Sequence, residues 1–216
     1  MIGLSLLVLA HGAAAETVTR TIPAKTLFPY LEAYYRLPGN ERDHFHLDYV
    51  FVSKIAPTEV RIVLKRKAGD VPLPIAPDHH FSTIPTAADI AAGTAAEVTA
   101  PKGSQLGMTI VLSETMEPAR LLDVATLKTG IDQARNGSKK AAGLLAAAIP
   151  DYRVVCFDGT HAGTIALQGG GTIPLRTFTA QGKPGPGTPC FAPEDQPTAT
   201  QITLDQAPSA MRIVGK

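Results

Sequence analysis

An excess of charge of one sign is missing from this chain, in which 20 Lys and Arg residues stand against 19 Asp and Glu residues. Because nucleic-acid-binding proteins carry a basic patch or a strong positive charge, no nucleic-acid partner is expected. Beyond residue 15 the sequence also lacks an apolar run of the roughly 20 residues that a membrane-spanning helix needs. No transmembrane span is therefore expected in that part of the chain.

Catalytic motifs are missing as well. The chain has no Gly-x-Ser-x-Gly elbow for a serine nucleophile and no His-Glu-x-x-His pattern for zinc. Asp158 and His161 lie three residues apart, but Asp158-Gly159 is typical of a turn rather than of a catalytic pair. The sequence therefore assigns no catalytic residue and no cofactor, and it favours a non-catalytic protein over an enzyme.

The N-terminal segment has the pattern of a secretory signal peptide. Residues 2–10 are almost wholly apolar, and small residues follow up to Ala15, with Ala13 and Ala15 in the positions that a signal peptidase reads. We expect a signal peptide over residues 1–15 with cleavage before Glu16, and a periplasmic or secreted bacterial protein. No Lys or Arg precedes the apolar core, which leaves the exact start codon open.

Cysteine is scarce, with Cys156 and Cys190 the only two. There is no Cys-x-x-Cys motif of a redox enzyme. Because exported proteins usually meet an oxidising compartment, the sequence predicts a Cys156–Cys190 disulfide. The chain-entropy model gives such a bridge a stabilisation of roughly 3 to 4 kcal/mol.

The most informative feature that is present is an internal similarity. Residues 48–64 align without a gap with residues 151–167, and the similarity continues downstream, where residues 71–73 align with 173–175, 98–99 with 202–203 and 108–111 with 211–214. A sequence repeat indicates repeated structure. We therefore expect two tandem repeats, one over residues 16–116 and one over residues 117–216.

Each repeat has the pattern of one helix followed by about five short strands. In the first, we expect a helix over residues 27–36, an irregular loop over residues 76–93, and strands over residues 44–53, 60–67, 71–75, 97–100 and 106–112. In the second, a helical pattern opens at Met116 and breaks at Asn136-Gly137. Strands are expected there over residues 152–157, 163–168, 172–178, 201–204 and 211–214.

The expected fold class is α+β, with each helix packed on a small antiparallel sheet and the two copies related by a pseudo-twofold axis. A β-sandwich with flanking helices is the alternative. Both arrangements predict a groove where the copies meet, and such clefts are favoured ligand sites.

Histidines are the candidate metal ligands. His44, His46 and Asp48 alternate along a predicted strand, so their side chains would share one face, as a metal site of two imidazoles and a carboxylate requires. His79 and His80, in the following loop, are further candidates. The competing interpretation places His44 and His46 at a solvated strand edge, with no metal.

Aromatic residues gather in the first predicted helix, which contains Phe28, Tyr30, Tyr34 and Tyr35. Two fit the core face, and Tyr30 and Tyr34 are the candidates for the surface, where tyrosines can contact a sugar or a protein partner. Packing under the sheet is the favoured use.

Three hypotheses about function follow. The favoured one is an exported, non-catalytic protein that binds a small ligand or an envelope protein in the groove between its copies. The second is a metal-dependent hydrolase that uses His44, His46, His79 and His80. The third is a structural component of the envelope that assembles through exposed sheet edges.

Overall fold

The computed structural model describes residues 16–178 and 187–215, apart from the side chain of Leu145. The expected signal peptide, residues 1–15, lies outside this range. The described residues form a mostly β structure of three antiparallel sheets with four α-helices. None of these helices is long and apolar enough to cross a membrane.

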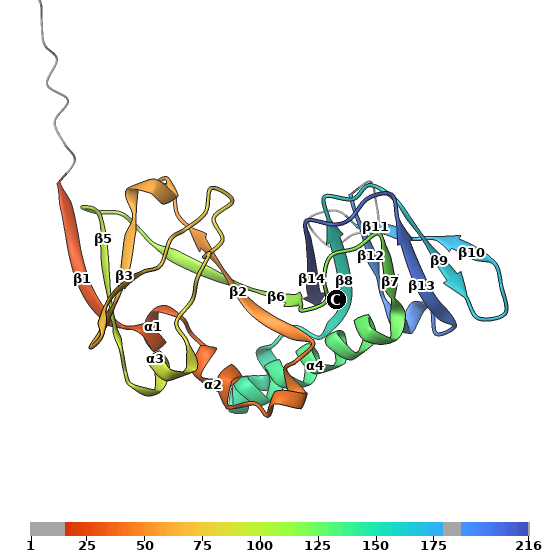
Figure 1. Cartoon of the computed structure of the whole chain (residues 1–216), viewed down its shortest axis with the longest axis horizontal. Helices are drawn as coiled ribbons and strands as arrows, with labels where there is room; N and C mark the ends of the chain where they lie inside the picture. The colour runs from red at the N-terminus through yellow and green to blue at the C-terminus, as the bar shows by residue number, and fades with distance from the viewer. Residues whose placement is uncertain (1–15, 179–186, 216) are drawn as a thin grey trace, which may run out of the picture.

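Two four-stranded sheets lie at opposite ends of the molecule (Figure 1). The first has the order β1-β5-β3-β4 and consists of β1 (Thr17–Pro23), β3 (Arg61–Arg66), β4 (Gly69–Pro72) and β5 (Ala95–Pro101). The second has the order β10-β9-β13-β7 and consists of β7 (Leu121–Asp123), β9 (Gly163–Leu167), β10 (Thr172–Pro174) and β13 (Ala199–Leu204). Read from opposite ends, the two orders match strand for strand in chain order.

A six-stranded sheet, called the central sheet below, joins the two ends. Its order is β11-β12-β8-β14-β6-β2, and its strands are β2 (Phe45–Val52), β6 (Gly107–Glu114), β8 (Tyr152–Asp158), β11 (Arg176–Phe178), β12 (Thr188–Phe191) and β14 (Ala210–Gly215). Residues 16–116 are called the first lobe and residues 117–215 the second lobe. The lobes meet where β6 pairs with β14.

The helices are α1 (Ala24–Leu27), α2 (Leu31–Arg36), α3 (Ala87–Ala91) and α4 (Val124–Ala142). Short 3-10 turns cover Gly39–Glu41, Pro57–Glu59, Gly143–Ala148 and Pro193–Asp195. The long helix α4 runs beneath the junction of the lobes, beside α2 (Figure 1), and it contacts strands of both lobes. Its apolar stripe, with Leu127, Ile131 and Ala134, is buried in the core.

One continuous core connects the elements. Ile62 and Val98 of the first outer sheet belong to the same buried cluster as Tyr49 and Leu112 of the central sheet. The expectation that a helix alone would cover each sheet was therefore incomplete, because sheets also pack on one another here.

Several boundaries differ from the sequence-based expectations. The helix expected over residues 27–36 is broken, because Tyr30 after Pro29 adopts a left-handed backbone with φ of 65°. The loop expected over residues 76–93 contains α3, which the Thr86 side chain caps by accepting the backbone N–H of Asp89. Strands β1, β7 and β12 were not predicted, and the single strand expected over residues 172–178 is two strands, β10 and β11.

The helix expected from Met116 begins later, at Val124, where the Asp123 side chain accepts the Thr126 N–H at 2.8 Å. It also continues through Asn136-Gly137, where a break was predicted. A Cβ atom at Gly137 would lie 2.9 Å from Phe45 Cζ and 3.0 Å from Leu37 Cδ1. Glycine at this position therefore permits a close approach of α4 to the sheet and to α2, and it does not end the helix.

Asp48 and Asp151, which the sequence similarity aligns, do not occupy corresponding positions. Asp48 lies within β2 opposite Val111, whereas Asp151 precedes β8. The residue opposite Val214, the counterpart of Val111, is Val154. The gapless alignment of these two strands is therefore three residues out of register with the structure.

Candidate functional site

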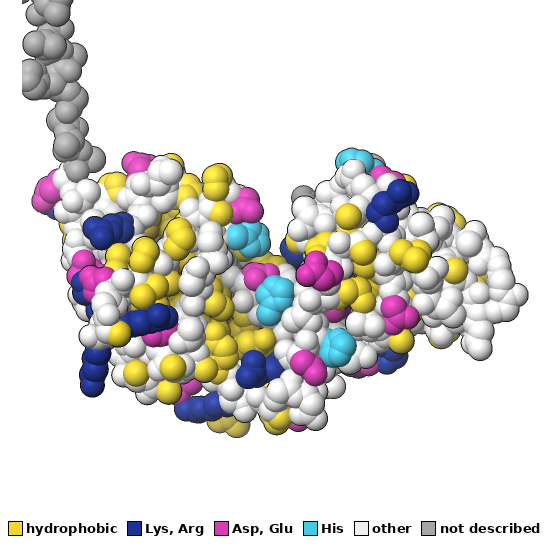
Figure 2. Space-filling view, viewed as in Figure 1, with side chains coloured by type: hydrophobic (Ala, Val, Ile, Leu, Met, Phe, Trp, Pro, Cys, Tyr) yellow, Lys and Arg dark blue, Asp and Glu magenta, His cyan; other side chains and the backbone are white. Residues whose placement is uncertain are grey.

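A cleft with a volume of about 530 Å³ opens between the two lobes. It is called the interlobe cleft, and the side chains argued below are His46, Asp48, Asp78, His80, Ser113, Glu117, Asp158 and Arg212. Figure 2 shows histidine and acidic side chains around a hollow between the lobes. Both lobes contribute residues, so the cleft depends on the junction between them.

Strand register explains why these residues share a face. Residues directly opposite each other in an antiparallel sheet project to the same side. One row of such partners crosses five strands of the central sheet, from β12 to β2, and consists of Cys190, Cys156, Arg212, Ser113 and His46. The alternate residues of β2, among them Phe45, Leu47 and Tyr49, point into the core. The part of this face that carries His46, Asp48, Ser113, Asp158 and Arg212 is thus the floor of the cleft.

Asp48 contacts two other polar side chains of the first lobe, those of Ser113 and His46. Ser113 Oγ donates a hydrogen bond to Asp48 Oδ2 at 2.5 Å, and His46 Nε2 lies 3.2 Å from Asp48 Oδ1. Burial by itself would raise the pKa of Asp48, but the hydrogen bonds with His46 and Ser113 outweigh it and hold the pKa below its ordinary value. Asp48 is therefore held as a carboxylate.

The order of these contacts bears on catalysis. A serine nucleophile needs a base that accepts its proton, normally an imidazole that a carboxylate orients from the other side. Here the carboxylate of Asp48 stands between Ser113 and His46. Ser113 is also buried, at 5% exposure. This arrangement places no imidazole base on Ser113.

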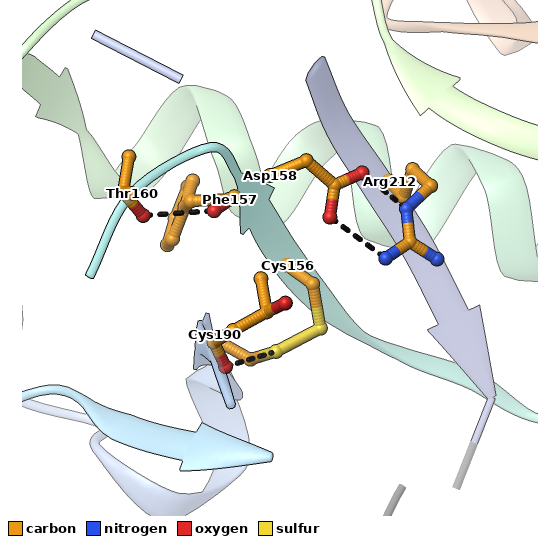
Figure 3. The surroundings of a disulfide bond; sticks show 7 residues. Cys156, Phe157, Asp158, Thr160, Cys190 and Arg212 are labelled. Carbon is orange, nitrogen blue, oxygen red and sulfur yellow. Dashed lines mark hydrogen bonds and ion pairs between the residues drawn. A yellow bond between two sulfur atoms is a disulfide. The ribbon is translucent and has the colours of Figure 1, made fainter. Parts of the chain in front are cut away.

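The second lobe contributes an ion pair. Arg212 on β14 binds Asp158 on β8 through two hydrogen bonds, of which the one from Nη2 to Oδ1 measures 2.7 Å (Figure 3). Next to it, Cys156 and Cys190 form the predicted disulfide. Because Cys156 lies directly opposite Arg212, the bridge between β8 and β12 braces the strand that carries Asp158.

The candidate histidines are divided by the structure. His80 reaches the cleft because residues 75–81 fold back along β2, with a bridge between Val50 and His80. His79 points away and stacks on Phe51, with ring centroids 6.2 Å apart. His44 is not among the residues that line the cleft, and its backbone N–H donates to Gln133 Oε1 at 2.8 Å.

The structure brings only some of the candidate metal ligands into one cleft. His46, Asp48 and His80 line one cleft, but among the described residues no three or more His, Cys, Asp or Glu side chains are grouped as a metal ion would require.

Glu114 is a residue that sequence reasoning missed. It lies at the end of β6 and is only 5% exposed, and neither carboxyl oxygen has a hydrogen-bond partner among the described residues. Burial raises the pKa of Glu114 to about 8. Its carboxyl packs against Gly130 of α4, where a Cβ atom would overlap it. The sequence did contain one signal for its burial. Glu114 follows the core residue Leu112 by two positions in β6, and residues two apart in a strand face the same side.

Comparison of the chain with protein-family models, with curated proteins and with solved structures finds no match. Function is therefore argued from the chemistry of the cleft.

Proposed function

We propose that this is an exported, non-catalytic protein that binds a small polar ligand in the interlobe cleft. The observation that carries the proposal is the convergence of polar side chains from both lobes on one cavity of about 530 Å³. That volume lies within the range of small-molecule sites, which run from about 300 to 1,000 Å³. Asp48 and Arg212 are each fixed by hydrogen bonds before any ligand arrives, which reduces the entropy lost on binding.

The charges around the cleft indicate the class of ligand. Five acidic side chains line it, those of Asp48, Asp78, Glu114, Glu117 and Asp158, beside the guanidinium of Arg212. Glu114, whose pKa burial raises to about 8, is protonated at neutral pH, so four carboxylates remain. Asp158 already neutralises Arg212. An ammonium group with neighbouring hydroxyls matches this surface better than an anion does, because an anion would face uncompensated carboxylates.

A duplication supports the place of the cleft. In our proposal the lobes are two copies of one module, related by a pseudo-twofold axis where β6 meets β14. The matching strand order of the outer sheets supports this. So does the pairing of Ile62 with Val98, because the residues aligned with them, Ile165 and Ile202, also pair. The cleft then lies at the interface of the copies.

Export to the periplasm or beyond is part of the proposal. The Cys156–Cys190 disulfide supports an oxidising compartment, since such bridges are rare in the cytosol.

The experiment is isothermal titration of residues 16–216 with small probes of different charge. Ethanolamine, choline and putrescine represent amines, acetate and succinate represent anions, and glucose represents a neutral polyol. We expect an amine to bind with a dissociation constant at least about tenfold lower than that of any anion. Asp48→Asn, which keeps an oxygen for the Ser113 hydrogen bond, should weaken that binding by about tenfold or more.

The matched control is Glu32→Gln, which removes a carboxylate from an exposed ion pair with Arg36 far from the cleft. It should leave amine binding unchanged. Equal affinity for amines and anions, or full affinity in Asp48→Asn, contradicts the proposed function.

The alternative functions predict different results. A metal-dependent hydrolase would retain zinc, iron or copper after purification and lose thermal stability on chelation. A structural component would assemble at high concentration, which light scattering would detect. The cleft chemistry favours neither over ligand binding.

A further inference from the structure

A second cavity lies on the other side of the central sheet from the interlobe cleft. Its volume is about 160 Å³, and it is partly open to solvent. It is lined by α2 with the preceding Tyr30, the C-terminal half of α4, the core-facing residues of β2 and β6, and Ile149 and Tyr152. The aliphatic part of its wall comes from Leu37, Leu47, Ile110, Leu112, Ala141 and Ile149. We call it the apolar pocket. It shares no lining residue with the interlobe cleft, so an argument about it stands apart from the proposed function.

Two of the four hydroxyl groups in the wall are satisfied within the protein. Tyr34 Oη donates to the backbone oxygen of Phe45 at 2.9 Å, and Ser138 Oγ donates to that of Arg135 at 3.2 Å. These hydroxyls therefore offer little to a water molecule in the pocket, and a water needs two to four polar partners. The interior suits an apolar occupant.

Two phenol groups border the pocket without such partners. Among the described residues, neither Tyr30 nor Tyr152 has a hydrogen bond from its hydroxyl. Tyr152 is half-buried, and burial raises its pKa, so its hydroxyl remains a neutral donor. A ligand with one acceptor atom could satisfy it.

Tyr30 is held at the pocket in an uncommon conformation. Its backbone has φ of 65°, a region that non-glycine residues seldom occupy, and its side chain remains 43% exposed. Neighbouring contacts hold this turn, since Tyr49 Oη donates to the backbone oxygen of Pro29 at 2.6 Å and the N–H of Tyr34 donates to that of Tyr30 at 2.9 Å. Backbone outliers of this kind recur at ligand clamps.

We propose that the apolar pocket is a binding site for a neutral, single-ring aromatic molecule with one hydrogen-bond acceptor. Size selects the ring, because dry cavities of about 150 Å³ bind benzene. The wall selects neutrality, because a charged group placed there would lose its hydration without compensation. The Tyr152 hydroxyl favours a ligand with an acceptor atom, and Tyr30 lines the pocket with its side chain 43% exposed.

The test is a titration of the methyl-labelled protein, residues 16–216, followed by NMR. The probes are toluene, benzonitrile, which adds one acceptor atom, and benzylammonium, which adds a charge. We expect saturable shifts of the Leu37, Leu47, Ile110 and Leu112 methyl groups with the two neutral probes, and benzonitrile should bind more tightly than toluene. Benzylammonium should leave these methyl groups unshifted.

Variants make the assignment specific. Ala141→Leu enlarges a wall residue and should weaken the binding of toluene by about tenfold or more, whereas Ala142→Leu, its neighbour outside the wall, should not. Tyr152→Phe should abolish the preference for benzonitrile and leave toluene binding intact. Both helix variants are first checked for the wild-type unfolding midpoint.

The site is refuted if the neutral probes give no saturable shifts at these methyl groups, or if Ala141→Leu binds toluene as tightly as Ala142→Leu does. An unchanged benzonitrile preference in Tyr152→Phe refutes the acceptor part. If Ala141→Leu does not fold, the test rests on the NMR titration of the wild type with toluene and benzonitrile. Methyl shifts that spread evenly over both lobes, and do not concentrate at the pocket, then refute the site.

Discussion

The side chain of Glu114 is a buried carboxyl group. It lies between the central sheet and α4, with no hydrogen-bond partner among the described residues. A buried carboxylate without a partner is strongly disfavoured relative to its hydrated state, so the group remains protonated to higher pH. This accounts for the pKa of about 8.

The raised pKa predicts a pH dependence of stability with a definite sign. Between the ordinary pKa of 4.5 and about 8, the folded protein binds a proton at Glu114 that the unfolded chain has released. The free energy of unfolding should therefore fall as pH rises through this window, by up to about 1.4 kcal/mol per pH unit from this group. Glu114→Gln, which does not titrate, should lack this contribution.

The measurement is urea unfolding of the wild type and of Glu114→Gln at pH 5, 6, 7, 8 and 9. The quantity of interest is the difference between the two free energies, because other titrating groups cancel in it. The free energy of unfolding of Glu114→Gln should rise relative to that of the wild type as pH increases to about 8, and the difference should then become constant. A difference that stays constant across this range would show that Glu114 is not protonated in the folded state.

Sequence reasoning located part of the candidate site at this scale and missed the rest. Alternation along β2 placed His46 and Asp48 on one face, and both line the cleft. Asp158 was assigned to a turn, but it ends β8 and pairs with Arg212. Cross-strand neighbours depend on register, and the register between distant strands is not readable from one strand's pattern.

At the scale of elements, the strands were predicted better than the helices. The strands predicted over residues 44–53, 60–67 and 152–157 end within two residues of the observed ends of β2, β3 and β8. Short helices were harder, because their stability comes from tertiary contacts rather than from local pattern. The five-residue α3 is an example, since Asp89 both completes the cap with Thr86 and pairs with Arg66 at 2.6 Å.

Helix α4 supports a second prediction. Replacing glycine by alanine in a helix interior normally stabilises it by up to about 1 kcal/mol. At Gly130 the added methyl group would overlap the Glu114 carboxyl. We therefore expect Gly130→Ala to destabilise the protein by about 1 to 3 kcal/mol. In a Glu114→Ala background the same change should be neutral or stabilising.

The measurement is thermal and urea unfolding of the wild type, Gly130→Ala, Glu114→Ala and the double variant. The coupling free energy between positions 114 and 130 should exceed about 1 kcal/mol. Gly137→Ala is the matched control, because it would meet Phe45 and Leu37 instead, and Glu114→Ala should not rescue it. Additive effects at positions 114 and 130 would mean that the carboxyl does not occupy the space beside the helix.

At the scale of the whole molecule, the lobes share structural elements. The central sheet passes from one to the other through the pairing of β6 with β14, and α4 contacts β2 and β6 as well as β8 and β13. Neither lobe could separate without exposing part of the common core. Sequence similarity suggested two halves, but it contained no information on a sheet shared between them, since that depends on pairing between strands about 100 residues apart.

This sharing leads to a prediction about unfolding. We expect one cooperative transition, in which β2 and β6 lose protection from hydrogen exchange together with β8 and β14. Reducing the Cys156–Cys190 bridge, which closes a loop with a sequence separation of 34 residues, should lower the stability of both lobes by about 3 to 4 kcal/mol.

The measurement is urea unfolding with and without dithiothreitol, followed by circular dichroism, and hydrogen exchange read by mass spectrometry. The Cys156→Ala/Cys190→Ala variant is the control, because its stability should not respond to the reductant. If strands of the first lobe retained protection while β8 and β14 exchanged, the lobes would be independent domains. The interlobe cleft would then vary in width with their motion, and Asp48 on β2 and Arg212 on β14 would no longer be held at a fixed separation by the pairing of β6 with β14.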